Sequence, residues 1–212
     1  MISLPRAEHI LSVLLGIASI GEVSADTLHF PGIVRITANL DNIQDHGTGC
    51  LIDGGLVLTA SHVVSGGGSI SCRITGRDIP GTIIYSGRRF DVAVIKLSEA
   101  EKTVPFQFAT RSPTLGDKLT FLGHGTGQLN PITGPLVGHV SGSKTGDLDT
   151  MRIKGAARQG DSGAPILNSD GELVGILWGS DGLDYYGTPL SYILLILHRL
   201  HLEGKIKNSV DK

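Results

Sequence analysis

The chain has 212 residues, of which 40% are hydrophobic and 18% are charged, and this balance excludes a disordered or fibrous protein. Its 18 basic and 20 acidic residues are mixed along the chain, so no basic face for nucleic acid is evident and no nucleic-acid partner is expected. Glycine is abundant, with 30 residues, and aromatic residues make up only 5%, which favours short strands and tight turns over long helices. The composition therefore predicts an all-β architecture.

Residues 1–25 have the pattern of an export signal. Arg6 precedes an apolar run from Ile10 to Ile20, and the segment Val23-Ser24-Ala25 predicts cleavage after Ala25. The alternatives are an uncleaved anchor or a packed N-terminal helix, although the run is shorter than the roughly 20 apolar residues of a membrane span. We expect a secreted or periplasmic protein without stable membrane association once the signal is removed.

Short β-rich runs bounded by turn residues recur through the rest of the chain, and the segment Asp53-Gly54-Gly55 predicts a hairpin between two of them. The predicted strands are 33–38, 50–52, 56–59, 69–75, 82–85, 92–97, 118–122, 136–141, 150–153, 165–167, 173–178 and 187–190. A polar, proline-marked stretch separates the two sets near residues 103–113. The economical interpretation is two small β-barrels, at 26–110 and 111–190.

The C-terminal part differs from the rest, because its apolar residues have helical spacing. Ser191 is expected to cap a helix from Tyr192 to about His201, within a helical segment 191–203 that a tail, 204–212, follows. Its apolar face comprises Ile193, Leu194, Ile196, Leu197 and Leu200. We expect this face to dock onto a barrel, and the alternative is a membrane-surface or partner-binding helix.

Two cysteines, Cys50 and Cys72, would lie in an oxidising compartment if the protein is exported. A bridge between them would close a loop containing His62 and stabilise the fold by roughly 3 kcal/mol. Two buried thiols are the alternative. No pair of cysteines or histidines has the short spacing of a zinc site, apart from His198 and His201 on the apolar helix, so no metal is expected.

Three polar residues stand in order at the edges of hydrophobic segments: His62 within Leu58–Val64, Asp91 within Phe90–Val94, and Ser162 within Gln159–Pro165. The glycines on either side of the Asp161-Ser162 pair predict a turn that exposes the serine hydroxyl and backbone amide. Taken singly, the three residues are a turn cap, a solvated carboxylate and a turn serine. Taken together, they have the order of one type of Ser-His-Asp triad.

From about residue 33 to 202, the chain resembles the trypsin/chymotrypsin superfamily of serine endopeptidases. Leu-Thr-Ala-Ser-His, ending at His62, is similar to that family's Leu-Thr-Ala-Ala-His block, and Asp-Val-Ala-Val, from Asp91, is similar to its Asp-Ile-Ala-Leu block. Gly-Asp-Ser-Gly-Ala-Pro, from Gly160, matches Gly-Asp-Ser-Gly-Gly-Pro except at Ala164. The resemblance implies two six-stranded antiparallel β-barrels followed by a C-terminal helix. The short spacings resemble the compact bacterial and Deg-type branch, and no PDZ module is expected after the barrels.

The resemblance implies that Ser162 is the nucleophile, that His62 is its general base and later an acid, and that Asp91 orients His62. It also implies that the backbone amides of Gly160 and Ser162 form the oxyanion hole. In trypsin-like zymogens, a newly exposed Ile-Val-Gly-Gly terminus pairs with the aspartate that corresponds to Asp161. The segment from Ile33 does not match that terminus, so no trypsin-style activation is expected.

The same resemblance implies a substrate pocket lined by Ala156, Trp178 and Gly179. Because Ala156 stands where a carboxylate would select lysine or arginine, we expect a preference for small or medium apolar residues before the scissile bond. Arg158 either attracts an acidic substrate residue or points to solvent. Tyr185 or Tyr186 is a candidate for narrowing the pocket.

The combined prediction is an exported serine endopeptidase that hydrolyses protein or peptide substrates through an acyl-enzyme, without a cofactor. One alternative is a pseudoprotease that keeps the scaffold for recognition only. Another is an interaction module anchored by the apolar C-terminal helix. The sequence does not indicate the oligomeric state.

Overall fold

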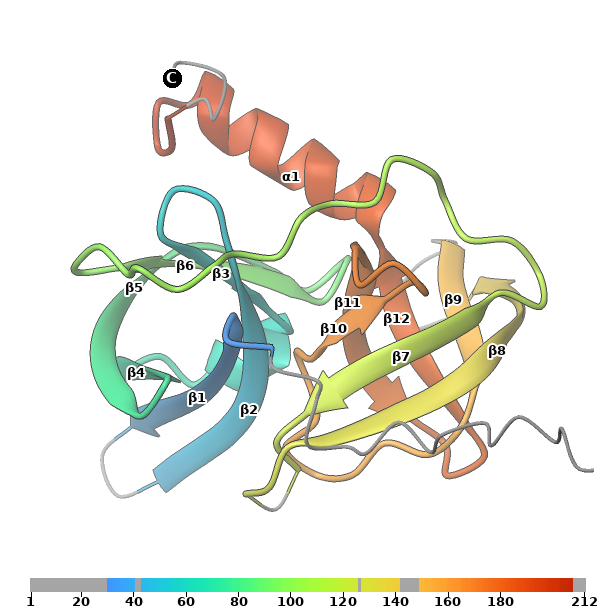
Figure 1. The fold of residues 1–212 in the computed structure, drawn as a ribbon. Helices are drawn as coiled ribbons and strands as arrows, with labels where there is room; N and C mark the ends of the chain where they lie inside the picture. Colours follow the sequence, from blue (N-terminus) through green and yellow to red (C-terminus); the bar gives the residue numbers. More distant parts are fainter. Residues whose placement is uncertain (1–29, 41–42, 126, 142–148, 208–212) are drawn as a thin grey trace, which may run out of the picture. The chain divides into compact units, whose positions relative to one another are not determined.

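The computed structural model of the chain describes residues 30–40, 43–125, 127–141 and 149–207, and β-strands dominate these ranges (Figure 1). Six antiparallel strands form the first barrel: β1 (Ile33–Leu40), β2 (Ile43–Ile52), β3 (Leu56–Thr59), β4 (Ser69–Ile74), β5 (Arg77–Gly87) and β6 (Val92–Leu97). Their order in the sheet is β1-β2-β3-β6-β5-β4, and pairing of β4 with β1 closes the barrel. The predicted six-stranded barrel is confirmed.

Six further antiparallel strands form the second barrel: β7 (Lys118–Gly123), β8 (Asn130–Ser141), β9 (Asp149–Lys154), β10 (Pro165–Leu167), β11 (Leu173–Ser180) and β12 (Asp184–Pro189). Their order is β10-β11-β12-β9-β8-β7, and β10 pairs with β7 to close the sheet. The fold class predicted from the sequence is therefore correct.

Each barrel has its own apolar interior, because alternate residues of a strand face inward. In β4, the buried residues are Ile70, Cys72 and Ile74, with partly or fully exposed residues between them. The second interior contains Leu119, Phe121, Leu136, Met151, Ile153, Ala164, Ile166, Val174, Leu177 and Tyr185. This alternation accompanies the β-rich runs, bounded by turn residues, from which the strands were predicted.

Several strands are longer than the sequence pattern predicts. Strand β2 begins at Ile43 rather than at Cys50, β5 covers Arg77–Gly87 rather than 82–85, and β8 begins at Asn130 rather than at Leu136. The additional residues pair through their backbones with neighbouring strands. Polar side chains do not prevent such pairing, so hydrophobic alternation underestimates the length of a strand.

The connection between the barrels runs from Ser98 to Asp117 and is hydrogen-bonded to both (Figure 1). The Phe106 amide donates to the Leu51 carbonyl oxygen in the first barrel at 2.9 Å. The Ala109 amide donates to the Leu173 carbonyl oxygen in the second barrel at 3.0 Å. These bonds tie the connecting segment down on both sides.

The predicted C-terminal helix is present as α1 (Leu190–Leu202), but its predicted cap is wrong. Pro189 is the N-cap residue, with extended backbone, and Ser191 lies exposed inside the first turn. Proline suits this boundary because its fixed φ is compatible with extended backbone and it has no amide to leave unsatisfied. The buried face comprises Leu190, Ile193, Ile196, Leu197 and Leu200, whereas Leu194, which we expected there, is 43% exposed.

The two cysteines are free, buried thiols, so the bridge considered from the sequence is not formed. Strand β1 lies between the strands that carry them, with Cys50 opposite Ile33 and Cys72 opposite Ile36. Ile36 and Cys72 belong to the interior of the first barrel. Cys50 faces the other side of the sheet, because Ile33 and Ile36 are three residues apart and side chains alternate. The two thiols therefore point away from each other.

The predicted export signal, residues 1–25, lies outside the described residues. Among the helices that the structure describes, none is both long enough and apolar enough to span a membrane.

Candidate active site

The structure brings His62 and Asp91 together. His62 lies in a single 3-10 turn (Ser61–Val64) that follows β3, and Asp91 immediately precedes β6, the neighbour of β3. The distance from His62 Nδ1 to Asp91 Oδ2 is 2.7 Å. Asp91 Oδ1 accepts hydrogen bonds from the Ser61 hydroxyl at 2.9 Å and from the His62 amide at 3.0 Å. Because a carboxylate only accepts, His62 Nδ1 carries the proton and Nε2 is left as a free base.

Asp91 has a backbone φ of +48°, in the left-handed region that few residues other than glycine adopt. Neighbouring groups hold this conformation. The Thr188 hydroxyl donates to the Phe90 carbonyl oxygen at 2.6 Å, and the Phe90 ring lies 4.8 Å from the ring of Tyr192 on α1. Backbone strain of this kind persists only where the surroundings over-determine it. The second barrel and α1 thus help to position an aspartate of the first barrel.

The pKa values of the pair shift in the directions expected for a bonded imidazole and carboxylate. The hydrogen bond to Asp91 raises the pKa of His62 above its ordinary value, against the opposing effect of burial. Burial by itself raises the pKa of Asp91, but hydrogen bonds from His62 and Ser61 outweigh it and the pKa lies below its ordinary value. Asp91 is therefore ionised wherever His62 titrates.

Ser162 lies in a turn between Gly160 and Gly163, both of which have a φ of +88°. A side chain at Gly163 would overlap the Thr48 carbonyl oxygen and the Thr59 hydroxyl, so only glycine fits the turn at this position. The Thr48 amide donates to the Ser162 carbonyl oxygen at 2.8 Å. This bond joins a loop of the second barrel to strand β2 of the first.

The backbone contacts place the Ser162 turn beside the His62 turn. A Cβ atom at Gly47 would lie 2.6 Å from a methyl group of Val63 and 3.1 Å from the Ser162 carbonyl oxygen. The two turns therefore flank the same stretch of β2. Among the residues that the structure describes, the Ser162 hydroxyl makes no hydrogen bond to His62. In unliganded enzymes such bonds are often long and tighten only when substrate binds.

Thr48 also arranges the backbone at Gly160. Its buried hydroxyl donates to the Gly160 carbonyl oxygen at 2.8 Å and accepts from the His124 amide at 3.0 Å. The carbonyl oxygens of Gly160 and Ser162 thus both accept from Thr48. Within the described part of the chain, the amides of Gly160 and Ser162 donate to no other group. Two free amides in one turn are the donors that an oxyanion requires.

Arg158 is paired with Asp161, a partner that neither interpretation of this arginine from the sequence included. Asp161 is fully buried, and the Arg158 side chain is 36% exposed. Arg158 Nε and Nη2 lie 3.2 Å from Asp161 Oδ2 and Oδ1, respectively, and the Arg158 amide donates to Oδ2 at 2.7 Å. The guanidinium therefore pairs with a residue of the Ser162 turn.

The residues predicted to line the substrate pocket lie on two segments. Ala156 is exposed in the segment before the Ser162 turn, whereas Trp178 and Gly179 are on β11. Trp178 is the extra residue of a β-bulge between Leu177 and Gly179. Its ring stacks on the ring of Tyr186, with 5.6 Å between the two ring centroids. A Cβ atom at Gly179 would meet no atom within 4 Å, so the chain leaves open space there.

The two tyrosines considered for the pocket differ. Tyr185 is fully buried in the second barrel, where its hydroxyl donates to the Leu119 carbonyl oxygen at 3.1 Å. Tyr186 lies beside Trp178 and donates to Asp181 Oδ2 at 2.7 Å. Of the two, Tyr186 is the one placed to affect a pocket at Trp178.

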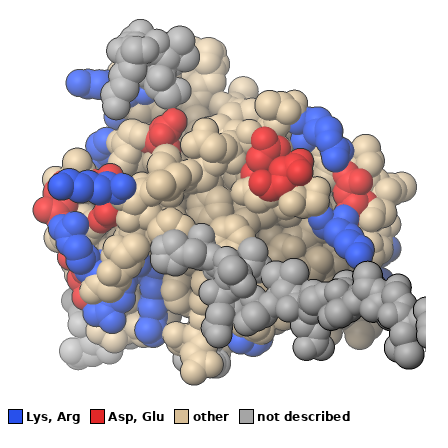
Figure 2. All heavy atoms as spheres, in the orientation of Figure 1, with Lys and Arg blue, Asp and Glu red and all other residues tan. Residues whose placement is uncertain are grey.

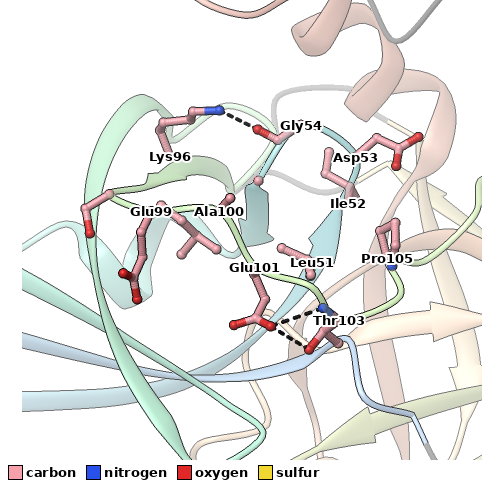
Figure 3. A pocket seen from close by; sticks show the side chains of 13 residues that line it. Leu51, Ile52, Asp53, Gly54, Lys96, Glu99, Ala100, Glu101, Thr103 and Pro105 are labelled. Atoms are coloured by element: carbon pink, nitrogen blue, oxygen red, sulfur yellow. Dashed lines mark hydrogen bonds between the residues drawn. The ribbon is translucent and has the colours of Figure 1, made fainter. Parts of the chain in front are cut away.

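A hollow of about 480 Å³ lies elsewhere on the first barrel (Figure 3). It is lined by the β2–β3 hairpin and by the start of the connection between the barrels, including Glu99 and Glu101. Lys96 Nζ donates to the Gly54 carbonyl oxygen at its rim, and Glu101 accepts from the Thr103 amide and hydroxyl. None of the candidate catalytic residues lines this hollow.

Charged side chains of both signs are interspersed on the face that Figure 2 shows, as the sequence suggests. Sequence reasoning missed the role of Thr48, because nothing near it in the chain indicates a contact with residue 160. It also missed the partner of Arg158, although the three-residue spacing to Asp161 was a readable signal.

Comparisons with known proteins show which proteins this chain resembles. Residues 47–176 match the model of a family described as "Trypsin-like peptidase domain". A protein named "Probable periplasmic serine protease do/HhoA-like", from Haemophilus influenzae, is 27% identical over 143 residues, which are 64% of this chain and 31% of that protein. The serine protease Rv3671c of Mycobacterium tuberculosis is 25% identical over 163 residues, which are 71% of this chain and 40% of that protein.

The crystal structure of the active form of Rv3671c has a TM-score of 0.74 with 21% sequence identity, covering 79% of this chain and 80% of the crystallised one. This likeness shows a shared fold. The chain spans less than half the length of the two curated relatives.

Proposed function

The chain belongs to the trypsin-like peptidase domain family, and we propose on that basis that it is a serine endopeptidase with Ser162, His62 and Asp91 as its catalytic triad. The observation that carries this proposal is the bond between His62 and Asp91, made beside a glycine-bracketed serine turn. The bond leaves the second imidazole nitrogen, Nε2, free to act as a base. A serine hydroxyl needs such a base near neutral pH.

In the proposed reaction, His62 Nε2 removes the proton of the Ser162 hydroxyl as Oγ attacks the scissile carbonyl carbon. The amides of Gly160 and Ser162 stabilise the oxyanion that forms, and loss of one such donor typically costs about 10²–10³-fold in kcat. His62 then gives the proton to the leaving amine, and an acyl-enzyme remains on Ser162. Water repeats the sequence and releases the acid. Asp91 holds the imidazole and stabilises its charged form.

The proposed substrate is a protein or peptide with a small or medium apolar side chain before the scissile bond. Three observations support this preference: Ala156 has only a methyl group, Gly179 leaves open space, and Trp178 and Tyr186 offer aromatic surface. The charge of Arg158 is paired with that of Asp161, which weighs against a preference for acidic residues.

We also propose that the protein acts in the periplasm or outside the cell. The apolar run in residues 1–25 supports this, and so does the word "periplasmic" in the name of the Haemophilus influenzae relative. Fractionation of cells that produce the full chain, with N-terminal sequencing of the product, tests it. A product in the cytoplasm that retains residue 1 would contradict export.

The activity is tested by labelling the purified protein with a fluorescent fluorophosphonate and by incubating it with a mixed peptide library. The matched variants are Ser162→Ala and Ser169→Ala, the latter in an exposed turn. Labelling and cleavage should be lost in Ser162→Ala alone, and the cleaved bonds report the preferred residue. A folded wild-type protein that is neither labelled nor active would favour a pseudoprotease instead.

A further inference from the structure

The catalytic turn contains an ion pair whose position suggests a further role. Asp161 is fully buried, and in the chain it stands between Gly160 and Ser162, whose amides form the proposed oxyanion hole. A buried carboxylate needs charge compensation, because removing a charge from water costs several kcal/mol. Arg158 supplies this compensation from within the same turn.

The pair closes a small ring of backbone and side chain. The Arg158 amide donates to Asp161 Oδ2 at 2.7 Å, and the Asp161 amide donates back to the Arg158 carbonyl oxygen at 3.1 Å. The guanidinium adds two contacts of 3.2 Å, one to each carboxylate oxygen. Such fork-like pairs define geometry as well as contributing energy. Gly160 lies inside this ring, so the direction of its amide depends on it.

The loop after β7 contacts the Arg158–Asp161 pair through glycines. A side chain at Gly123 would overlap the Asp161 carboxylate, and a Cβ atom at Gly125 would lie 2.6 Å from the Arg158 guanidinium carbon. A side chain at Gly160 would overlap the Gly125 carbonyl oxygen. Glycine at these three positions lets the loop after β7 pack directly against the ion pair and the turn.

We propose that Arg158 is a positioning residue, which holds Asp161 so that the amides of Gly160 and Ser162 point to one oxyanion site. The inference rests on the proposed function. Arg158 acts through Asp161 rather than on the substrate. Because both partners lie in the turn itself, the pair does not require a new chain terminus.

The test compares Arg158→Met and Arg158→Lys with Arg73→Met. Arg73 makes an analogous two-pronged pair with Asp78, but both side chains are more than half exposed and lie on the first barrel. Turnover of a cleavable peptide is measured together with hydrogen exchange of the peptide covering residues 156–164. Hydrogen exchange does not depend on activity, so the two readouts separate this inference from the proposed function.

We expect Arg158→Met to lower kcat by about 100-fold or more with little change in KM, since an oxyanion-hole donor is misplaced. Exchange in residues 156–164 should rise, while that of the barrel strands stays unchanged. Arg158→Lys should recover at least a tenth of the wild-type kcat, because the charge is kept. Arg73→Met should match the wild type in both measurements.

Three outcomes would overturn the inference. The first is an unchanged kcat in Arg158→Met. The second is a rise in the KM of that variant alone, which would mean that the guanidinium contacts the substrate. The third is a loss of kcat in that variant with no change in hydrogen exchange. If the wild type has no Ser162-dependent activity, the proposed function fails, and hydrogen exchange alone then decides whether Arg158 orders the turn. Exchange that is equal in the wild type and in Arg158→Met would refute the ordering.

Discussion

Replacing Asp91 with asparagine tests the arrangement of the proposed triad most directly. The fold should tolerate the change, because asparagine also adopts the left-handed backbone found at this position. In the wild type, the Asp91 carboxylate accepts two hydrogen bonds at Oδ1, from the Ser61 hydroxyl and the His62 amide, and one at Oδ2, from His62 Nδ1. An asparagine side chain has one oxygen and one NH₂ group, so it cannot serve both sides as an acceptor.

The two bonds at Oδ1 decide which way the asparagine turns. With its oxygen toward Ser61 and the His62 amide, its NH₂ group faces His62 Nδ1, which must then lose its proton and accept. The proton moves to Nε2, the atom that should take the proton of Ser162. We therefore expect kcat to fall about 10⁴-fold, as it does in the general Ser-His-Asp template. Losing a charge-assisted bond should lower stability by about 1.5–3 kcal/mol.

The assay is kcat/KM for a cleaved peptide between pH 5 and 9. Only neutral His62 is a base, so activity falls as pH drops through the raised pKa of His62, and the wild-type acid limb should lie above pH 6.5. In Asp91→Asn the pKa of His62 drops, so the limb moves to lower pH. Asp45→Asn is the control, because the Asp45 charge also raises the pKa of His62 but Asp45 makes no hydrogen bond to it among the described residues. An Asp91→Asn variant with more than a tenth of the wild-type rate at pH 8 would refute this reasoning.

Three further predictions concern the helix, the Ser162 turn and the cysteines. Ile193→Ala, on the buried face of α1, should lower the free energy of unfolding by about 2–5 kcal/mol and Tm by roughly 5–15 °C. The Leu195 side chain is 58% exposed, so Leu195→Ala should leave Tm nearly unchanged, and equal effects in thermal unfolding would show that α1 does not pack as described. Gly160→Ala should reduce kcat by at least about 100-fold, because the backbone φ of Gly160 is +88° and the added methyl group would overlap the Gly125 carbonyl oxygen. A variant as active as the wild type would show that the turn tolerates a side chain at this position. Burial raises the pKa of both Cys50 and Cys72, the latter to about 12. Iodoacetamide should therefore modify the two thiols only after the protein unfolds. A disulfide found in the folded protein by mass spectrometry would overturn the assignment of free thiols.

The sequence by itself determined the fold class and the order of the candidate catalytic residues. In β4, the alternation of buried residues is visible in Ile70, Cys72 and Ile74. The hairpin at Asp53-Gly54-Gly55 consists of residues that favour a tight turn, and the two glycines have φ of +79° and +68°. These signals are local, because side-chain alternation and turn chemistry depend on adjacent residues. For the same reason, the family resemblance was readable from short motifs.

Only the tertiary structure decided which groups meet across long stretches of the chain. The Thr48 hydroxyl reaches Gly160 over 112 residues, because the two barrels dock along β2. The separation of Cys50 and Cys72 depends on the strand register around β1, and the fate of Arg158 depends on how tightly the turn around Asp161 closes. Local sequence patterns indicate the register of a hairpin, where a short turn fixes it, but not the pairing of strands that are distant in the chain or the docking of the barrels. Those depend on how the buried faces of whole sheets pack, to which every strand contributes.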